Sequence, residues 1–195
     1  MFDSHTTAQD STPNSGPNHA AATDAAVASN PYGALAAAIA RASTGERAAL
    51  ARLDPDQPLR SQAIAALSRA LVDTRLEPEN WHPATWQRWA LVAHGIALAG
   101  HDGAARLGAQ LARAKVAESR VTRLLTARGD AFTQLLPRLL RLLASQGVRP
   151  NWYELGPLIH KEGKPDSTAQ QEADAIRLGI AKAYFLTISK SEKSL

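Results

Sequence analysis

Residues 107–130 carry the pattern that most constrains how this chain folds. They read LGAQLARAKVAESRVTRLLTARGD, and their large apolar residues recur near the three- and four-residue spacing of a helix that packs one face against a core. These apolar positions are Leu107, Leu111, Val116, Val121, Leu124 and Leu125. The charged residues at the other positions are mostly basic, namely Arg113, Lys115, Arg120, Arg123 and Arg128, and include only two acidic residues, Glu118 and Asp130. The stretch therefore predicts helical structure with a buried apolar face and a positively charged solvent face.

The composition of the whole chain also favours helices. Hydrophobic residues make up 45 % of the 195, but Ala dominates them and aromatic residues are only 5 %. Closely packed helices suit such a composition better than β-sheets, which need branched and aromatic side chains. We therefore expect an all-α fold, either a compact multi-helix bundle or two helical lobes with a boundary near residues 100–116.

Turn-forming residues divide the chain into its expected parts. Residues 1–30 hold almost no large apolar side chain, so we expect a disordered tail there and an all-helical domain over residues 31–195. Helix starts are marked by a capping box at Ser43 and Glu46, by Pro83 and by Asn151. Besides the stretch at 107–130, the patterns predict helices over 32–42, 47–53, 59–72, 84–99, 152–160 and 169–188.

Two further helical features are expected in the C-terminal half. Asp130 should cap a helix that runs through Leu143, and Pro137 inside it should kink this helix or mark its true start. The last helix should carry Arg177 and Lys182 on its surface. Its inward residues should be Ile176, Leu178, Ile180, Tyr184 and Phe185.

Catalytic and metal-binding patterns are missing from the sequence. The chain has no cysteine, which excludes disulfides, iron–sulfur clusters and thiolate zinc sites, and no histidine pair has the spacing of a helical zinc site. It contains no phosphate-binding glycine motif, so we expect neither a cofactor nor enzymatic activity. The opening residues lack the pattern of a secretory signal, and no window of eighteen residues is wholly apolar, so we expect a cytoplasmic protein.

Positive charge is concentrated in the middle of the chain. Residues 101–150 hold nine basic and three acidic residues, whereas residues 1–30 hold three Asp and neither Lys nor Arg. In the middle region Arg outnumbers Lys eight to one. The planar guanidinium group can hold a phosphate through two hydrogen bonds, so this region suits the nucleic-acid backbone.

Several blocks of the chain, in order, resemble one family. They read LGAQLA, VAESRVTRLLTARGD, PRLLRLLASQG, NWYELGPLI and AKAYFLTISK. From about Gly45 to the C-terminus the chain resembles the CasB family, the small α-helical subunit of the type I-E CRISPR Cascade complex. The resemblance implies a non-catalytic subunit that is present as a pair among other Cascade subunits. It also implies a basic surface that holds the guide crRNA and target DNA and stabilises the displaced single strand of the R-loop.

The resemblance also indicates which residues meet nucleic acid. The strongest candidates lie in the blocks VAESRVTRLLTARGD and PRLLRLLASQG, and the others precede the turn or lie near the two ends of the matched region. The full set is Arg120, Arg141, Arg123, Arg128, Arg138, Arg113, Lys115, Arg52, Arg177 and Lys182. The chain departs from the family in its acidic-leaning tail and in residues 161–171, which look longer than the family pattern.

Two other functions remain open at the level of sequence. Residues 107–125 look like a scaffold helix, a turn and a recognition helix, in which Ser119, Arg120 and Arg123 would face base edges in a sequence-specific helix-turn-helix regulator. The basic residues could also be the solvated surface of an Ala-rich helical scaffold protein. A regulator would discriminate strongly between duplex sequences, whereas the CasB-like subunit would be indifferent to sequence and would accept single strands.

Overall fold

The computed structural model describes residues 30–53 and 61–193, which form helices and connections without a β-strand. The helices are α2 (Pro31–Arg41), α3 (Thr44–Ala51), α4 (Ser61–Asp73), the short 3₁₀ helix η1 (Pro78–Asn80), α5 (Pro83–Ala99), α6 (Leu107–Arg113), α7 (Glu118–Thr126), α8 (Gly129–Ser145), α9 (Trp152–Lys161) and α10 (Ser167–Glu192). The expected all-α class is therefore confirmed. The expected tail lies outside the described residues, except for Asn30.

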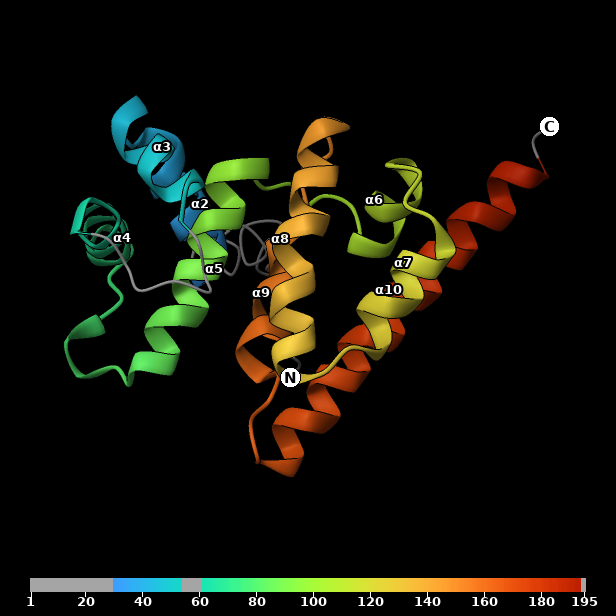
Figure 1. Cartoon of the computed structure of the whole chain (residues 1–195). Coiled ribbons are helices and arrows are strands. Elements are labelled where there is room, and N and C mark those ends of the chain that lie inside the picture. The colour runs from blue at the N-terminus through green and yellow to red at the C-terminus, as the bar shows by residue number, and fades with distance from the viewer. Residues whose placement is uncertain (1–29, 54–60, 194–195) are drawn as a thin grey trace, which may run out of the picture.

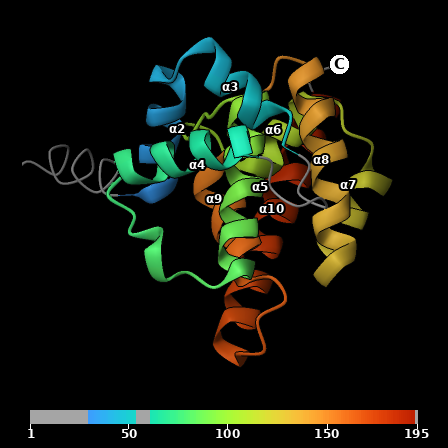
Figure 2. The same cartoon turned by 60° about the vertical axis from the view of Figure 1, so that its left-hand side comes forward.

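The helices are arranged around α5, α8 and α9. Figure 1 shows α8 between α5 on one side and α7 on the other, and it contacts both. Helices α2 and α3 pack on α5, with α4 outside them, while α6 and α7 pack on the long helix α10 (Figures 1 and 2). One core cluster contains residues from both groups, including Leu35 of α2, Leu140 of α8 and Ile180 of α10.

Several predicted helix starts are confirmed. Ser43 and Glu46 form the expected capping box, because the Glu46 amide donates to the Ser43 hydroxyl at 3.3 Å and the Ser43 amide donates to the Glu46 carboxylate at 3.0 Å. Pro83 is the first residue of α5. The Asn151 side chain accepts a hydrogen bond from the Tyr153 amide at 2.9 Å and thereby caps α9.

The stretch at 107–130 is divided into two helices by a turn. Lys115 has φ +51°, the left-handed conformation that reverses the chain between α6 and α7. Leu107 and Leu111 of α6 and Val121 and Leu124 of α7 are nonetheless buried. The expected apolar face is therefore confirmed, although it is shared by two helices.

The start of α8 differs from the prediction. Asp130 lies in the first turn, and the N-cap position belongs to Arg128. Pro137 lies inside a continuous helix, so its interpretation as the true start is wrong. A proline removes one helical hydrogen bond, but the burial of Leu136 and Leu140 on both sides of it stabilises the helix enough to continue.

Two expectations about α10 are also wrong. The Leu178 and Phe185 side chains are 71 % and 45 % exposed, whereas Arg177 is only 5 % exposed. The reason is the phase of the helix, since its buried residues recur every three or four positions and Arg177 falls within that series. The series is Ala169, Ala173, Arg177, Ile180 and Tyr184.

Candidate nucleic-acid interface

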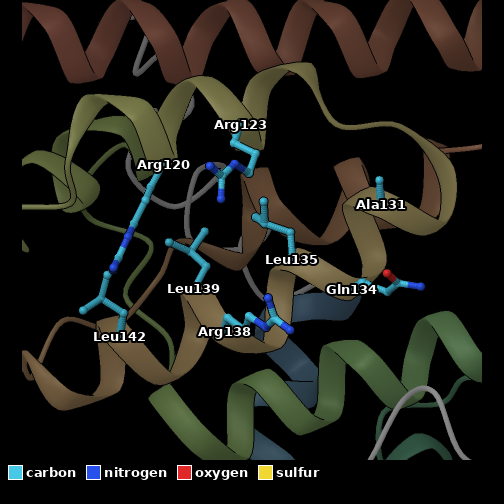
Figure 3. A pocket seen from close by; sticks show the side chains of 8 residues that line it. All are labelled: Arg120, Arg123, Ala131, Gln134, Leu135, Arg138, Leu139 and Leu142. Carbon is cyan, nitrogen blue, oxygen red and sulfur yellow. The ribbon is translucent and has the colours of Figure 1, made fainter.

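A groove of about 580 Å³ lies between α7 and α8. Arg120 and Arg123 reach it from α7, and Arg138 reaches it from α8. Figure 3 shows Arg120 extending from α7 toward Leu142, with Leu135 and Leu139 between the arginines. The groove therefore combines cationic walls with an apolar floor.

The arginines point into the groove because of the residues buried beside them. Helix α7 buries Val121 and Leu124, each directly after one of the two arginines, so Arg120 and Arg123 are turned about 100° away from the core. Helix α8 buries Leu136 and Leu140, two positions before and after Arg138. Packing of the apolar faces therefore leaves all three guanidinium groups exposed to solvent.

The positive charge of this groove is not neutralised by the described part of the protein. Within residues 30–53 and 61–193, Arg120, Arg123 and Arg138 have no carboxylate within ion-pair distance. By contrast, Arg106, which does not line the groove, pairs with Glu154. The three groove arginines can therefore bind an external anion without breaking an internal ion pair.

A second basic hollow lies on another side of α8. It has a volume of about 330 Å³ and is formed by α3, α5 and α8, with Arg52 and Arg141 among its lining residues. The Arg141 Nε atom donates to the Pro137 carbonyl oxygen at 3.2 Å, which orients the side chain. Neither arginine has a carboxylate partner among the described residues.

Helix α8 contributes residues to both hollows. Arg138 and Arg141 are three positions apart, so their side chains leave the helix about 60° apart. Arg138 lines the groove with α7, and Arg141 lines the hollow with α3 and α5. The structure thus brings together five of the ten predicted residues around one helix: Arg52, Arg120, Arg123, Arg138 and Arg141.

Three other predicted residues are exposed but lie outside these two hollows. Arg113 lines a hollow of about 320 Å³ with Arg149 and His101. Lys115 occupies the turn between α6 and α7, and Lys182 lies on the exposed side of α10. These residues extend the positive surface without joining the groove.

Arg128 and Arg177 are used by the protein itself. Arg128 donates to the carbonyl oxygens of Leu125 and Ala127 and pairs with Asp174 at 3.0 Å. Arg177 is buried and pairs with Glu162. Their hydrogen bonds hold the connection between α7 and α8, so neither guanidinium group faces the groove.

Arg149 is a basic residue that sequence reasoning did not select. It is exposed beside Arg113, and its methylene groups lie against Gly100. It falls between the blocks PRLLRLLASQG and NWYELGPLI, so no matched motif pointed to it. Only its place in the basic region of residues 101–150 could have indicated it.

The described residues contain no group of three or more histidine, aspartate or glutamate side chains that could hold a metal ion. Within residues 30–53 and 61–193, no helix has the length and apolar character needed to cross a bilayer.

Comparison with known proteins identifies the family. The family model for CRISPR-associated protein Cse2 matches residues 46–185, a range that includes both basic hollows. No curated protein and no solved structure matches the chain. The match spans well over half of the 195 residues and confirms the resemblance seen in the sequence blocks. The chain therefore belongs to the family of the CRISPR-associated protein Cse2, also called CasB.

Proposed function

We propose that this protein binds nucleic acid through the basic surface around α8 and thereby stabilises the R-loop of a CRISPR RNA-guided complex. Membership of the Cse2 family makes the chain a small subunit of Cascade in type I-E CRISPR defence. The proposed ligands are the crRNA and the target DNA, including its displaced single strand. The other proposed partners are the remaining Cascade subunits and a second copy of the same chain.

The groove between α7 and α8 carries this proposal. Arg120, Arg123 and Arg138 converge on it without carboxylate partners among the described residues. Guanidinium groups hold phosphates bidentately, and such contacts carry no sequence information. A surface of this kind suits a subunit that must accept any target sequence.

The energetics of the R-loop explain why such a subunit is useful. The RNA–DNA duplex that forms is about as stable as the DNA duplex that it replaces, so a few contacts to the backbone can decide whether the loop stays open. Such contacts stabilise the displaced strand by neutralising its phosphates. The protein therefore needs no catalytic group for this role. Since its proposed ligands are intracellular, we also expect it to act in the cytoplasm.

A sequence-specific regulator has less support. The helix-turn-helix pattern concerns only residues 107–125, whereas the family match spans 46–185. Two of its three expected base-reading residues, Arg120 and Arg123, line the groove against α8. A recognition helix needs these side chains on a face that enters the major groove of DNA.

Purification of the tagged protein from its native host tests this proposal. The preparation is divided and treated with or without nuclease, and the co-purifying proteins and RNA are identified. We expect a fixed set of several other proteins together with an RNA of uniform length. Recovery of the chain alone, or with duplex DNA of a single sequence, would contradict the proposal and favour the regulator.

A further inference from the structure

Arg177 and Glu162 form a buried ion pair beneath the connection between α7 and α8. Arg177 lies on α10, and Glu162 is the C-cap residue of α9. Their side chains are only 6 % and 5 % exposed. The pair therefore lies inside the protein, between the C-terminal end of α9 and helix α10.

Both members of the pair also bond to the backbone of that connection. The Glu162 Oε1 atom accepts a hydrogen bond from the Gly129 amide at 2.7 Å, and the Arg177 Nη2 atom donates to the Ala127 carbonyl oxygen at 3.3 Å. Only Ala127 and Arg128 separate the end of α7 from the start of α8. The pair thus holds Ala127, the first residue of this connection, and Gly129, the first residue of α8.

The pair is itself fixed by its surroundings. Arg177 also donates to Asp174 at 3.2 Å, and its guanidinium carbon lies 5.7 Å from the centre of the Phe132 ring in α8. The Arg88 side chain of α5 donates to the Glu162 carbonyl oxygen at 3.2 Å. Contacts from α8 and α10 therefore restrain the Arg177 side chain, and the contact from α5 holds the backbone of Glu162.

Stability alone does not account for an ion pair at this place. Removing two charges from water is costly, and well-packed apolar residues often stabilise a protein as much as the ion pair that they replace. Apolar side chains cannot bond to the Ala127 carbonyl or the Gly129 amide. What the pair provides, and apolar residues do not, is a fixed direction for the backbone on both sides of Arg128.

We propose that Arg177 and Glu162 are positioning residues that set the angle between α7 and α8. This inference rests on the proposed function, because that angle determines how far Arg120 and Arg123 lie from Arg138 across the groove. The two residues touch no ligand. They act by keeping three guanidinium groups at a spacing that suits one nucleic-acid backbone.

The test compares the full-length protein with the double variant E162L/R177M. Replacing both partners removes the backbone bonds without leaving a buried unpaired charge. Nitroxide labels at Thr122→Cys in α7 and Gln146→Cys after α8 report the distance between the helices by pulsed EPR, and the chain has no other cysteine. Affinity is measured with a single-stranded DNA oligonucleotide of mixed sequence, and stability by thermal unfolding.

We expect the double variant to unfold within a few degrees of the wild type, with a shifted and broadened nitroxide distance. Its affinity should fall roughly tenfold, within the range of couplings between distant parts of a protein. The control Glu172→Gln lies on α10, as Arg177 does, and breaks an exposed ion pair with Lys161 of α9. It should change neither the distance nor the affinity.

A double variant with wild-type distance and wild-type affinity would overturn the positioning role. The nitroxide measurement does not depend on the proposed function. If the wild type has no affinity for the oligonucleotide, the proposed function fails, and the nitroxide distance still decides whether the pair sets the angle.

Discussion

Arg52 at the end of α3 and Arg141 in the C-terminal part of α8 line the same hollow. On a neighbouring side of α8, Arg138 lines the groove that it shares with α7. Helix α8 therefore lies between two basic depressions, and its exposed ridge separates them. A nucleic-acid strand in the α7–α8 groove could continue across this ridge toward Arg52.

Neutralising the second hollow should weaken binding on every sequence. The variant R52Q/R141Q should lower the slope of log K against log salt by about 0.7 for each lost phosphate contact on single-stranded DNA. The measurement is a salt titration of fluorescence anisotropy. The matched control is R41Q/R75Q, which removes two exposed arginines that line neither hollow. Equal slopes for the two variants would exclude Arg52 and Arg141 from the interface.

Gly108 should be intolerant of a side chain, because it is the point where α6 meets α10. A Cβ atom there would collide with the Ile180 carbonyl oxygen and come within 2.6 Å of the Tyr184 amide nitrogen. Gly108→Ala should therefore lower the free energy of unfolding by about 3 kcal/mol, the upper range for overpacked sites. Chemical denaturation measures this change.

Gly45 supplies the control for this substitution. It is exposed in α3, and a Cβ atom there would meet nothing within 4 Å. Gly45→Ala should raise the free energy of unfolding by up to about 1 kcal/mol, because alanine favours the helix. If both variants lose the same stability, α6 and α10 do not pack as closely as described.

His160 should make the fold less stable in acid. Burial, together with the smaller effect of the charges of Arg88 and Lys164, lowers its pKa from an ordinary value of 6.5 to about 4. The ring lies 4.5 Å from the centre of the Trp89 ring, and its Nε2 atom is buried without a hydrogen-bond partner among the described residues. The folded state therefore favours the neutral ring.

The direction of the pH effect follows from this lowered pKa. Above pH 6.5 the imidazole is neutral in both states, and its stability contribution is complete. As the pH falls from 6.5 toward 4, His160 takes up a proton in the unfolded chain before it does so in the folded protein. The free energy of unfolding therefore falls by at most about 3 kcal/mol. Chemical denaturation at pH 7.5 and at pH 4.5 measures this change. Between the two pH values, His160→Phe should lose less free energy of unfolding than the wild type. Equal losses would mean that His160 does not cause the effect.

Local patterns predicted most of the fold because they act within a few residues. The Ser43–Glu46 capping box and the Asn151 cap satisfy backbone groups of their own helices, so their effect can be read from the sequence. The phase of α10 could not be read in this way. Arg177 occupies a buried position because Glu162 neutralises it, and the partner lies in a different segment of the chain.

The exposure of the arginines in the candidate site could also be predicted, because it too follows from a local pattern. Arg120 and Arg123 follow from the helical pattern around Val121 and Leu124, since a helix that buries those residues must expose the arginines. The pattern did not indicate that Arg128 would be engaged by Asp174, which lies on α10. Ion pairs between helices that are far apart in the sequence depend on the tertiary fold, so they cannot be predicted from local sequence patterns.

Arg120, Arg123 and Arg138 are proposed to bind the nucleic-acid backbone together. The most direct test is a salt titration of single-stranded DNA binding by R120Q/R123Q/R138Q. The comparison variant is R41Q/R75Q/K193Q, which removes equal charge from exposed positions outside the groove. We predict that the slope of log K against log salt falls by about 2 for the groove variant, equally on unrelated sequences, and stays closer to wild type for the comparison variant. Identical slopes for the two variants, or a loss confined to one duplex sequence, would contradict the account.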